Sequence, residues 1–321
     1  MNGRQHIRRV CHKGFAPPTL ITVGNLRFLV AEQLRQINVL ASSIFLEPVA
    51  RSTAPAAAIA CLHAASQSED ALVLILPADH LILDEPAFLK AIDAASSAAK
   101  SGYLVSLGMR VKSPHTGYGY IRKAGKLHNF DGVFALDHFV EKPDAKRAEK
   151  FFKSGDYLWN GGIFLFSASA YLDELSTFSP VTVSSCTQAM EVCIKDRDFR
   201  RLNSTAFNDC PYGAIDTEIM EKTDKGAVVP VDIGWSDVGS WRGLWDIGER
   251  DVAENVLVGD VIIEEVTNSY LRSDGPLLGC IGLDDMVVVA SQDAVLVAPK
   301  GRAEDVIESL IASRRMEGQS I

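Results

Sequence analysis

The sequence has no paired cysteines, no long apolar run and no excess of positive charge, and each absence excludes a class of protein. Its six cysteines, at positions 11, 61, 186, 193, 210 and 280, form no C-x-x-C pair and predict no zinc site. No apolar run approaches the ~18 to 20 residues of a membrane-spanning helix. A net charge of −9 argues against a nucleic-acid-binding surface. We expect a cytoplasmic protein with reduced thiols and neither nucleic-acid nor membrane partners.

What is present suits a globular protein of about two domains, at roughly 150 residues each. Of 321 residues, 47% are apolar and 23% are charged. Residues 1–16 are basic, follow no pattern and lack the apolar segment of a secretory signal. We expect them to be disordered, or to result from a gene mis-started or truncated at its 5′ end.

Strand and helix patterns alternate through the first half of the chain. The segment ALVLIL (71–76) is an unbroken apolar run, typical of a parallel strand buried on both faces. Alternation of this kind predicts a doubly wound α/β sheet. Strands are expected at 19–23, 43–48 and 103–111, and helices at 27–37, 54–66 and 84–100.

The second half is more mixed, and its end is rich in short strands. Strands are expected at 116–123, 137–143, 163–168 and 227–233, and helices at 145–155, 169–176, 183–201 and 215–223. From about residue 255, short strands alternate with Gly, Asp, Asn and Ser, and a charged helix is expected from Glu304. We therefore divide the chain into residues 1–16, a main domain over 17–250, and a β-rich part over 251–321 that could serve as a dimerisation surface.

Two aspartates are candidate ligands for a magnesium ion. Asp79 directly follows ALVLIL, and ligands of doubly wound sheets bind outside the carboxyl ends of the strands. Asp237 lies in the turn GWSDVGSW. Magnesium takes one or two carboxylates and leaves its other positions to water and phosphate, which this pair would suit. Each aspartate could instead cap a turn, and His80 is expected to be a structural hydrogen-bonding residue.

Three further segments could bind a phosphorylated sugar. Glu141 and Lys142 end the strand DHFVEKP, and their types suit sugar hydroxyls and a phosphate. Asn160 lies beside two glycines in WNGG, where a ligand can approach the backbone. Gly119 lies in TGYGY. Alone, each segment could equally be a solvated strand end, an ordinary turn or a glycine-containing strand.

The ordered series of motifs is far more specific than its parts. It comprises RFLVAEQLRQI, FLEPVARSTAPA, LILPADH, TGYGYI, FVEKPD, YLWNGGIFLF, AIDTEIMEKT and DIGWSDVGSW. Over roughly residues 17–310 this series resembles bacterial mannose-1-phosphate guanylyltransferases, which implies the Rossmann-like mixed sheet of nucleotide-diphospho-sugar transferases. The implied reaction joins GTP and mannose 1-phosphate into GDP-mannose and diphosphate by a magnesium-assisted in-line displacement.

The resemblance also implies residue roles. Asp79 and Asp237 match metal-binding aspartates, and Glu141 and Lys142 match residues that hold the sugar and its phosphate. The remaining matches are sugar-site positions at Asn160 and Gly119, a nucleotide-side loop with Glu47, Arg51 and Thr53, and a nearby segment with Asp216 and Lys222.

One departure from the family pattern is large. Relatives begin with a strand and a G-x-G-T-R loop that holds the triphosphate, and residues 1–321 contain no such loop. Loss of this βα unit would leave neighbouring strand edges unpaired. Low activity is therefore expected, and a non-catalytic sugar-nucleotide-binding or regulatory protein is an alternative. Serine at position 52, where asparagine is usual, is a milder change, and the sequence implies no isomerase domain of the cupin type.

Overall fold

The computed structural model describes residues 7–11, 14–303 and 305. The chain forms two compact units, Met1–Trp235 and Ser236–Ile321, whereas the sequence patterns suggested a division after residue 250. Among the described residues, no helix is both long and apolar enough to cross a membrane.

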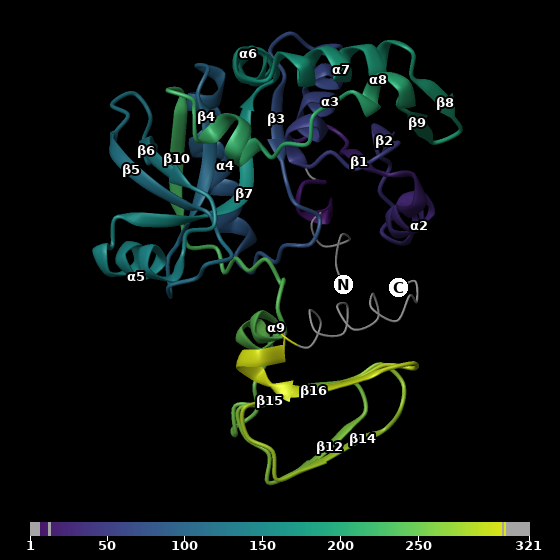
Figure 1. The fold of residues 1–321 in the computed structure, drawn as a ribbon, viewed down its shortest axis with the longest axis vertical. Helices are drawn as coiled ribbons and strands as arrows, with labels where there is room; N and C mark the ends of the chain where they lie inside the picture. The colour runs from purple at the N-terminus through teal and green to yellow at the C-terminus, as the bar shows by residue number, and fades with distance from the viewer. Residues whose placement is uncertain (1–6, 12–13, 304, 306–321) are drawn as a thin grey trace. The chain divides into compact units, whose positions relative to one another are not determined.

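Unit 1 is built around a mixed six-stranded sheet in the order β3-β7-β4-β10-β6-β5 (Figure 1). β4 and β10 are parallel, whereas β7 runs antiparallel to both β3 and β4. The strands are β3 (Leu72–Ile75), β4 (Leu104–Arg110), β5 (Tyr120–Lys126), β6 (Phe134–Val140), β7 (Tyr157–Ser167) and β10 (Gly226–Val231). The mixed α/β architecture expected from the sequence is confirmed.

A second sheet of unit 1 has four strands in the order β1-β2-β9-β8. Its first three strands run parallel, and β8 closes it as an antiparallel edge. The strands are β1 (Thr19–Val23), β2 (Ser43–Glu47), β8 (Ile194–Asp196) and β9 (Phe199–Arg201).

Helices cover both faces of the six-stranded sheet. Alternate residues of its strands point to opposite faces and therefore pack in different cores. Val73 packs in one core with the helices α3, α6 and α7, whereas Leu72 and Leu74 pack in the other with α4 and α5. The helical elements of unit 1 are η1 (Gly24–Leu26), α2 (Arg27–Gln36), α3 (Thr53–Ala65), α4 (Glu85–Lys100), α5 (Ala145–Ser154), α6 (Ala168–Phe178), α7 (Pro180–Glu191), α8 (Ser204–Asn208) and η2 (Asp216–Met220).

Residues 183–201 correct one expectation, because they are not a single helix. The helix α7 ends at Glu191, and a β-hairpin of β8 and β9 follows. Arg197 turns the hairpin with a φ of 55°, and an ion pair of 2.8 Å between Arg201 and Asp196 joins its strands. β9 extends the four-stranded sheet by pairing with β2, a tertiary contact that the local sequence does not reveal.

Near the N-terminus, residues 7–9 are helical. Arg9 is 5% exposed and donates to the Ile82 carbonyl at 2.9 Å. Its guanidinium carbon lies 5.9 Å from the centre of the Phe88 ring on α4. Arg9 therefore packs against the loop before α4 and against α4 itself.

β1 and β3 are edge strands of the two sheets of unit 1. β1 ends the four-stranded sheet and pairs with β2, and β3 ends the six-stranded sheet and pairs with β7. The helix α3 packs against both edge strands. All five residues of β1 are partly exposed, whereas all five of β2 are buried. β1 is therefore the more exposed of these two neighbouring strands.

Unit 2 combines a short helix with two small β-sheets. Its four-stranded sheet has the order β11-β13-β15-β16, and β12 pairs with β14 in parallel. The elements are α9 (Trp241–Ile247), β11 (Val256–Val258), β12 (Val261–Glu264), β13 (Tyr270–Ser273), β14 (Leu278–Ile281), β15 (Met286–Ala290), β16 (Val295–Pro299) and η3 (Lys300–Arg302). The expected β-rich C-terminal part is confirmed, and the helix expected from Glu304 lies almost entirely outside the described residues.

Candidate functional site

Asn160 is the centre of a polar cluster in unit 1. Its position in β7 places its amide against η2, where the Asn160 Nδ2 donates to Asp216 Oδ1 at 2.5 Å. The same side chain accepts from the Gly162 N–H at 3.1 Å through Oδ1. The backbone N–H of Asn160 donates to the Gly119 carbonyl at 2.8 Å. Three segments that are distant in the sequence therefore meet at Asn160.

Glu141 lies directly after β6 and joins this cluster. A Cβ atom added to Gly119 would lie 2.5 Å from Glu141 Oε2 and 3.2 Å from the Asn160 Cβ. Only glycine leaves room for the carboxylate at this point. The backbone N–H of Glu141 donates to Glu221 Oε1 at 3.2 Å, which ties the cluster to the segment after η2.

The two predicted lysines take different places. Lys142 lies with its Nζ 3.8 Å from Glu141 Oε1 and has an exposed side chain, so it can reach an anion at the cluster. Its φ of 43° is unusual for a non-glycine residue and precedes Pro143. Lys222 pairs with Glu218 at 3.4 Å, one helical turn away. Lys142 is therefore the lysine that the structure brings to the cluster.

The cluster is strongly acidic and partly buried. Burial, followed by the charge of Asp216, raises the pKa of Glu141. Burial is also the main cause that raises the pKa of Asp216. Buried carboxylates that are held by hydrogen bonds can accept from sugar hydroxyls, which are neutral donors. The arrangement suits a polyhydroxylated ligand better than a bare anion.

The nucleotide-side loop is held to the same cluster. Thr53 Oγ1 accepts from the Ile215 N–H at 3.0 Å, next to Asp216. Arg51 donates to the Asn208 carbonyl at 2.5 Å, while its Nε is buried without a partner among the described residues. The loop is thus hydrogen-bonded to the residue that directly precedes η2.

Glu47, which the resemblance places on the nucleotide side, is a buried residue. It is 7% exposed and ends β2, and its Oε1 is buried without a hydrogen-bond partner among the described residues. Burial raises the pKa of Glu47 to about 7. Burial without a hydrogen-bond donor makes the charged form of this carboxylate costly.

Replacing Glu47 with glutamine is expected to stabilise the protein most at alkaline pH. The pKa of Glu47 in the folded state, about 7, exceeds the ordinary value of 4.5, so the folded state binds this proton more tightly than the unfolded state. The stability that the bound proton contributes is therefore lost as pH rises through 7. The variant should be more stable by about 1 to 3 kcal/mol at pH 8, and this advantage should shrink toward pH 5. Urea unfolding at both pH values measures it; an equal difference at the two would contradict the titration of Glu47.

Asp79 and Asp237 are placed in different units. Asp79 follows β3 with its carboxylate 83% exposed, and Oδ1 lies 3.9 Å from His80 Nε2. Asp237 belongs to unit 2, where its Oδ1 accepts from the Gly239 N–H at 3.3 Å. Among the described residues, no group of three or more His, Cys, Asp or Glu could hold a metal ion. A cation here would need ligand oxygens in addition to these two carboxylates.

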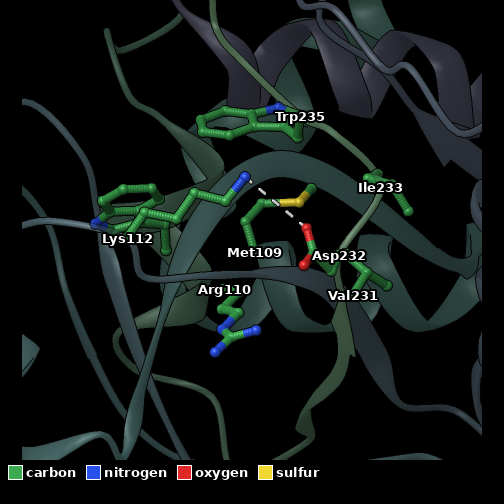
Figure 2. A pocket seen from close by; sticks show the side chains of 8 residues that line it. Met109, Arg110, Lys112, Val231, Asp232, Ile233 and Trp235 are labelled. Atoms are coloured by element: carbon green, nitrogen blue, oxygen red, sulfur yellow. Dashed lines mark ion pairs between the residues drawn. The ribbon is translucent and has the colours of Figure 1, made fainter. Parts of the chain in front are cut away.

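A small hollow beside the cluster was not predicted from the sequence. Figure 2 shows Lys112 and Asp232 across it, with their charged atoms 3.9 Å apart and the Trp235 ring above them. Trp159, the neighbour of Asn160, also lines it. The structural role expected for His80 is confirmed, because its Nδ1 accepts from Trp235 Nε1 at 3.1 Å. Trp235 in the motif GWSDVGSW was the available signal for the hollow.

This geometry agrees with comparisons with known protein families. A family model described as nucleotidyl transferase matches residues 4–254. The chain belongs to the nucleotidyl transferase family. A second model, described as a mannose-phosphate isomerase/GMP-like β-helix domain, matches residues 259–310 of the β-rich part.

Curated relatives share much of the sequence. The alginate biosynthesis protein AlgA of Pseudomonas aeruginosa is 41% identical over 320 residues, which cover 99% of this chain and 66% of the relative. The mannose-1-phosphate guanylyltransferase RfbM of Salmonella typhimurium is 44% identical over 302 residues, which cover 94% of this chain and 63% of RfbM. This nucleotidyl transferase thus spans slightly less than two thirds of the length of these relatives.

A solved structure has the same fold over nearly the whole chain. The Thermus thermophilus protein described as a mannose-1-phosphate geranyltransferase superposes with a TM-score of 0.83 and 26% identity, covering 98% of this chain and 89% of that one. A Helicobacter pylori protein described as a mannose-6-phosphate isomerase is 29% identical with a TM-score of 0.61, covering 68% of this chain and 84% of that one.

Proposed function

We propose that this nucleotidyl transferase is a mannose-1-phosphate guanylyltransferase that makes GDP-mannose and diphosphate from GTP and mannose 1-phosphate. The observation that carries the proposal is the convergence of Gly119, Glu141, Asn160 and Asp216 on one acidic cluster. Relatives named for this activity, such as RfbM, support the choice of substrates. Relatives named for alginate and xanthan biosynthesis support a role in polysaccharide precursor supply.

In this proposal the cluster binds the sugar and Lys142 binds its phosphate. Glu141 and Asp216 accept from hexose hydroxyls, while the Asn160 amide keeps the Asp216 carboxylate in place. Lys142 offers a flexible positive charge beside Glu141, which suits a phosphate oxygen. Arg51 and Thr53 lie on the nucleotide side, and Lys222 acts by pairing with Glu218.

We further propose that Asp79 and Asp237 bind one magnesium ion. The exposed carboxylate of Asp79 can take a cation that also carries water and phosphate oxygens. When bound, the ion would neutralise phosphate charge during the displacement. The chain's own contribution is to hold the sugar phosphate and the α-phosphorus in line, which lowers the entropic cost of their reaction.

A non-catalytic sugar-nucleotide-binding protein is the second candidate. The cluster of Glu141, Asn160 and Asp216 favours it, because these residues would serve binding as well as turnover. Phosphorus NMR of the purified chain with GTP, mannose 1-phosphate and Mg²⁺ separates the two. Slow, Mg²⁺-dependent formation of GDP-mannose supports the enzyme, whereas saturable binding of GDP-mannose without any turnover supports the second candidate.

We also propose a cytoplasmic homodimer that uses unit 2. Apolar side chains on its strands are exposed, with Ile262 at 61%, Ile281 at 70% and Val295 at 68%. Exposed apolar groups that gather on a small β-rich unit are typical of protein interfaces. Sedimentation equilibrium of the chain tests this; a monomer at all concentrations would contradict it.

A further inference from the structure

The segment that carries Asp216 is a single wide helical turn. In η2 the Asp216 carbonyl accepts from the Glu221 N–H, five residues later, at 2.9 Å. Turns of this π type are rare and short, and they occur frequently at functional sites. In a regular α-helix, residues five apart project about 140° away from each other. Here Asp216 and Glu221 both contact the acidic cluster, Asp216 through Asn160 and Glu221 through Glu141.

The backbone on both sides of Glu221 is fixed to the core of unit 1. Met220, directly before it, is buried in that core. Two residues after Glu221, Thr223 donates through Oγ1 to Glu174 Oε2 on α6 at 2.5 Å. The Thr223 N–H also donates to the Ile219 carbonyl at 2.9 Å. Although Glu221 itself is exposed, its side chain therefore extends from a rigid part of the chain.

Glu221 holds the turn that follows β6. Its Oε1 accepts from the backbone N–H of Glu141 at 3.2 Å. The next residue, Lys142, has a φ of 43°, a conformation that is costly for a non-glycine residue and persists only where surrounding contacts hold it. The bond from Glu221 acts directly before this residue, and the ring of Pro143 restricts the backbone directly after it. Together they set the direction in which the Lys142 side chain leaves the chain.

A carboxylate at position 221 is electrostatically unfavourable for the fold. Burial and the charge of Asp216 are the main causes that raise the pKa of Glu141, and the charge of Glu221 raises this pKa further. After burial, the charge of Glu221 also raises the pKa of Asp216. Like charges at these distances destabilise each other. A local arrangement that works against stability is typical of a functional site.

Lys142 is the cation beside this turn. Its Nζ lies 3.8 Å from Glu141 Oε1, and its side chain is exposed. We propose that Glu221 is a positioning residue that holds the Glu141–Lys142 turn, and with it the Lys142 ammonium, in place for the phosphate attached to the bound sugar. Glu221 acts through its bond to the Glu141 N–H, and the inference rests on the sugar-phosphate site proposed above.

Removal of the acceptor tests the proposal. Glu221→Ala cannot accept from the Glu141 N–H, so calorimetric titration of GDP-mannose into the full chain with Mg²⁺ should show about fivefold weaker binding, as expected for one lost hydrogen bond. Glu221→Gln keeps an oxygen acceptor at this position and should bind within about twofold of the wild type. Wild-type affinity in the alanine variant, or an equal loss in both variants, would overturn the role of this hydrogen bond.

A double-mutant cycle tests whether Glu221 acts through Lys142. Lys142→Met keeps most of the apolar stem but removes the ammonium group. Added to Lys142→Met, Glu221→Ala should change the affinity for GDP-mannose by less than about 1.5-fold, because the charge that it positions is already absent. A contribution of Glu221 to the fold alone would give the same fivefold loss in both backgrounds, and that result would contradict the proposal.

Asp224→Ala is the matched control. Asp224 is an exposed carboxylate three residues further along the same segment, so this variant removes the same charge without removing the acceptor for Glu141. Its affinity for GDP-mannose should equal that of the wild type. Binding as weak as that of Glu221→Ala would show that general charge is responsible. Thermal unfolding of both variants shows whether a loss of stability could explain weaker binding.

Lys142→Met also separates failure of this inference from failure of the proposed function. If Lys142→Met weakens binding of GDP-mannose and Glu221→Ala does not, the positioning role is wrong and the sugar-phosphate site stands. If the wild type shows no saturable binding, or Lys142→Met binds as tightly as the wild type, the proposed site itself is wrong and the inference is overturned with it.

Discussion

Replacing Asp79 with asparagine is expected to lower kcat/KM for GDP-mannose formation by about a thousandfold, or roughly 4 kcal/mol of transition-state stabilisation. Asp79 presents an exposed carboxylate at the end of β3, where the amide of asparagine would bind a divalent cation much more weakly. Any remaining rate should depend less steeply on the Mg²⁺ concentration. Initial rates measured across a Mg²⁺ series test both effects.

Asp84→Asn is the control for this experiment. Asp84 lies five residues further along the same loop and caps α4 through Oδ1, a role that asparagine fills equally well. The control removes the same charge without removing the proposed ligand, so its rate should stay near that of the wild type. A similar loss of activity in both variants would show that general charge, not Asp79 as a ligand, is responsible.

Replacing Asn160 with alanine is expected to reduce kcat/KM for mannose 1-phosphate by roughly thirty- to a hundredfold. The change removes the amide that holds Asp216 at 2.5 Å and leaves a partly buried carboxylate without this donor. The sugar hydroxyls would lose an ordered acceptor, so most of the effect should appear in KM for the sugar. Steady-state kinetics with each substrate varied in turn measure it.

The KM for GTP provides the internal control for Asn160→Ala. The nucleotide-side loop meets the cluster through Thr53 and Ile215, and this bond does not involve Asn160. The KM for GTP should therefore change by less than about threefold. Equal increases in both KM values would indicate a general disruption of the fold and contradict a sugar-specific role.

Much of the fold could be predicted because its strands carry strong local patterns. The run ALVLIL predicted a buried strand, and β3 occupies Leu72–Ile75 within it. Asp84 and Gly155 were expected to bound helices, and they lie at the start of α4 and the end of α5. Caps and apolar periodicity are local properties, so sequence alone reveals them.

The hairpin of β8 and β9 could not be predicted in the same way. Residues 194–201 are mostly charged, and their strand conformation depends on pairing with β2, about 150 residues earlier in the chain. Likewise, the burial of Arg9 depends on Ile82 and Phe88, which local patterns do not connect to it.

The sugar cluster shows the same limit at the level of the site. Glu141, Asn160 and Asp216 were each candidates, but their mutual contacts join segments 19 to 75 residues apart. The family resemblance brought them together before the structure did. It did not reveal that Glu47 is buried or that Trp235 binds His80, because both depend on side-chain packing.

Calorimetric titration of GDP-mannose into the chain in the presence of Mg²⁺ tests the central claim most directly, because it depends on the acidic cluster whether or not turnover occurs. We predict saturable binding to the wild type and at least about tenfold weaker binding to Asn160→Ala. Absence of saturable binding, or equal affinity of the two proteins, would show that Glu141, Asn160 and Asp216 do not form the sugar-nucleotide site.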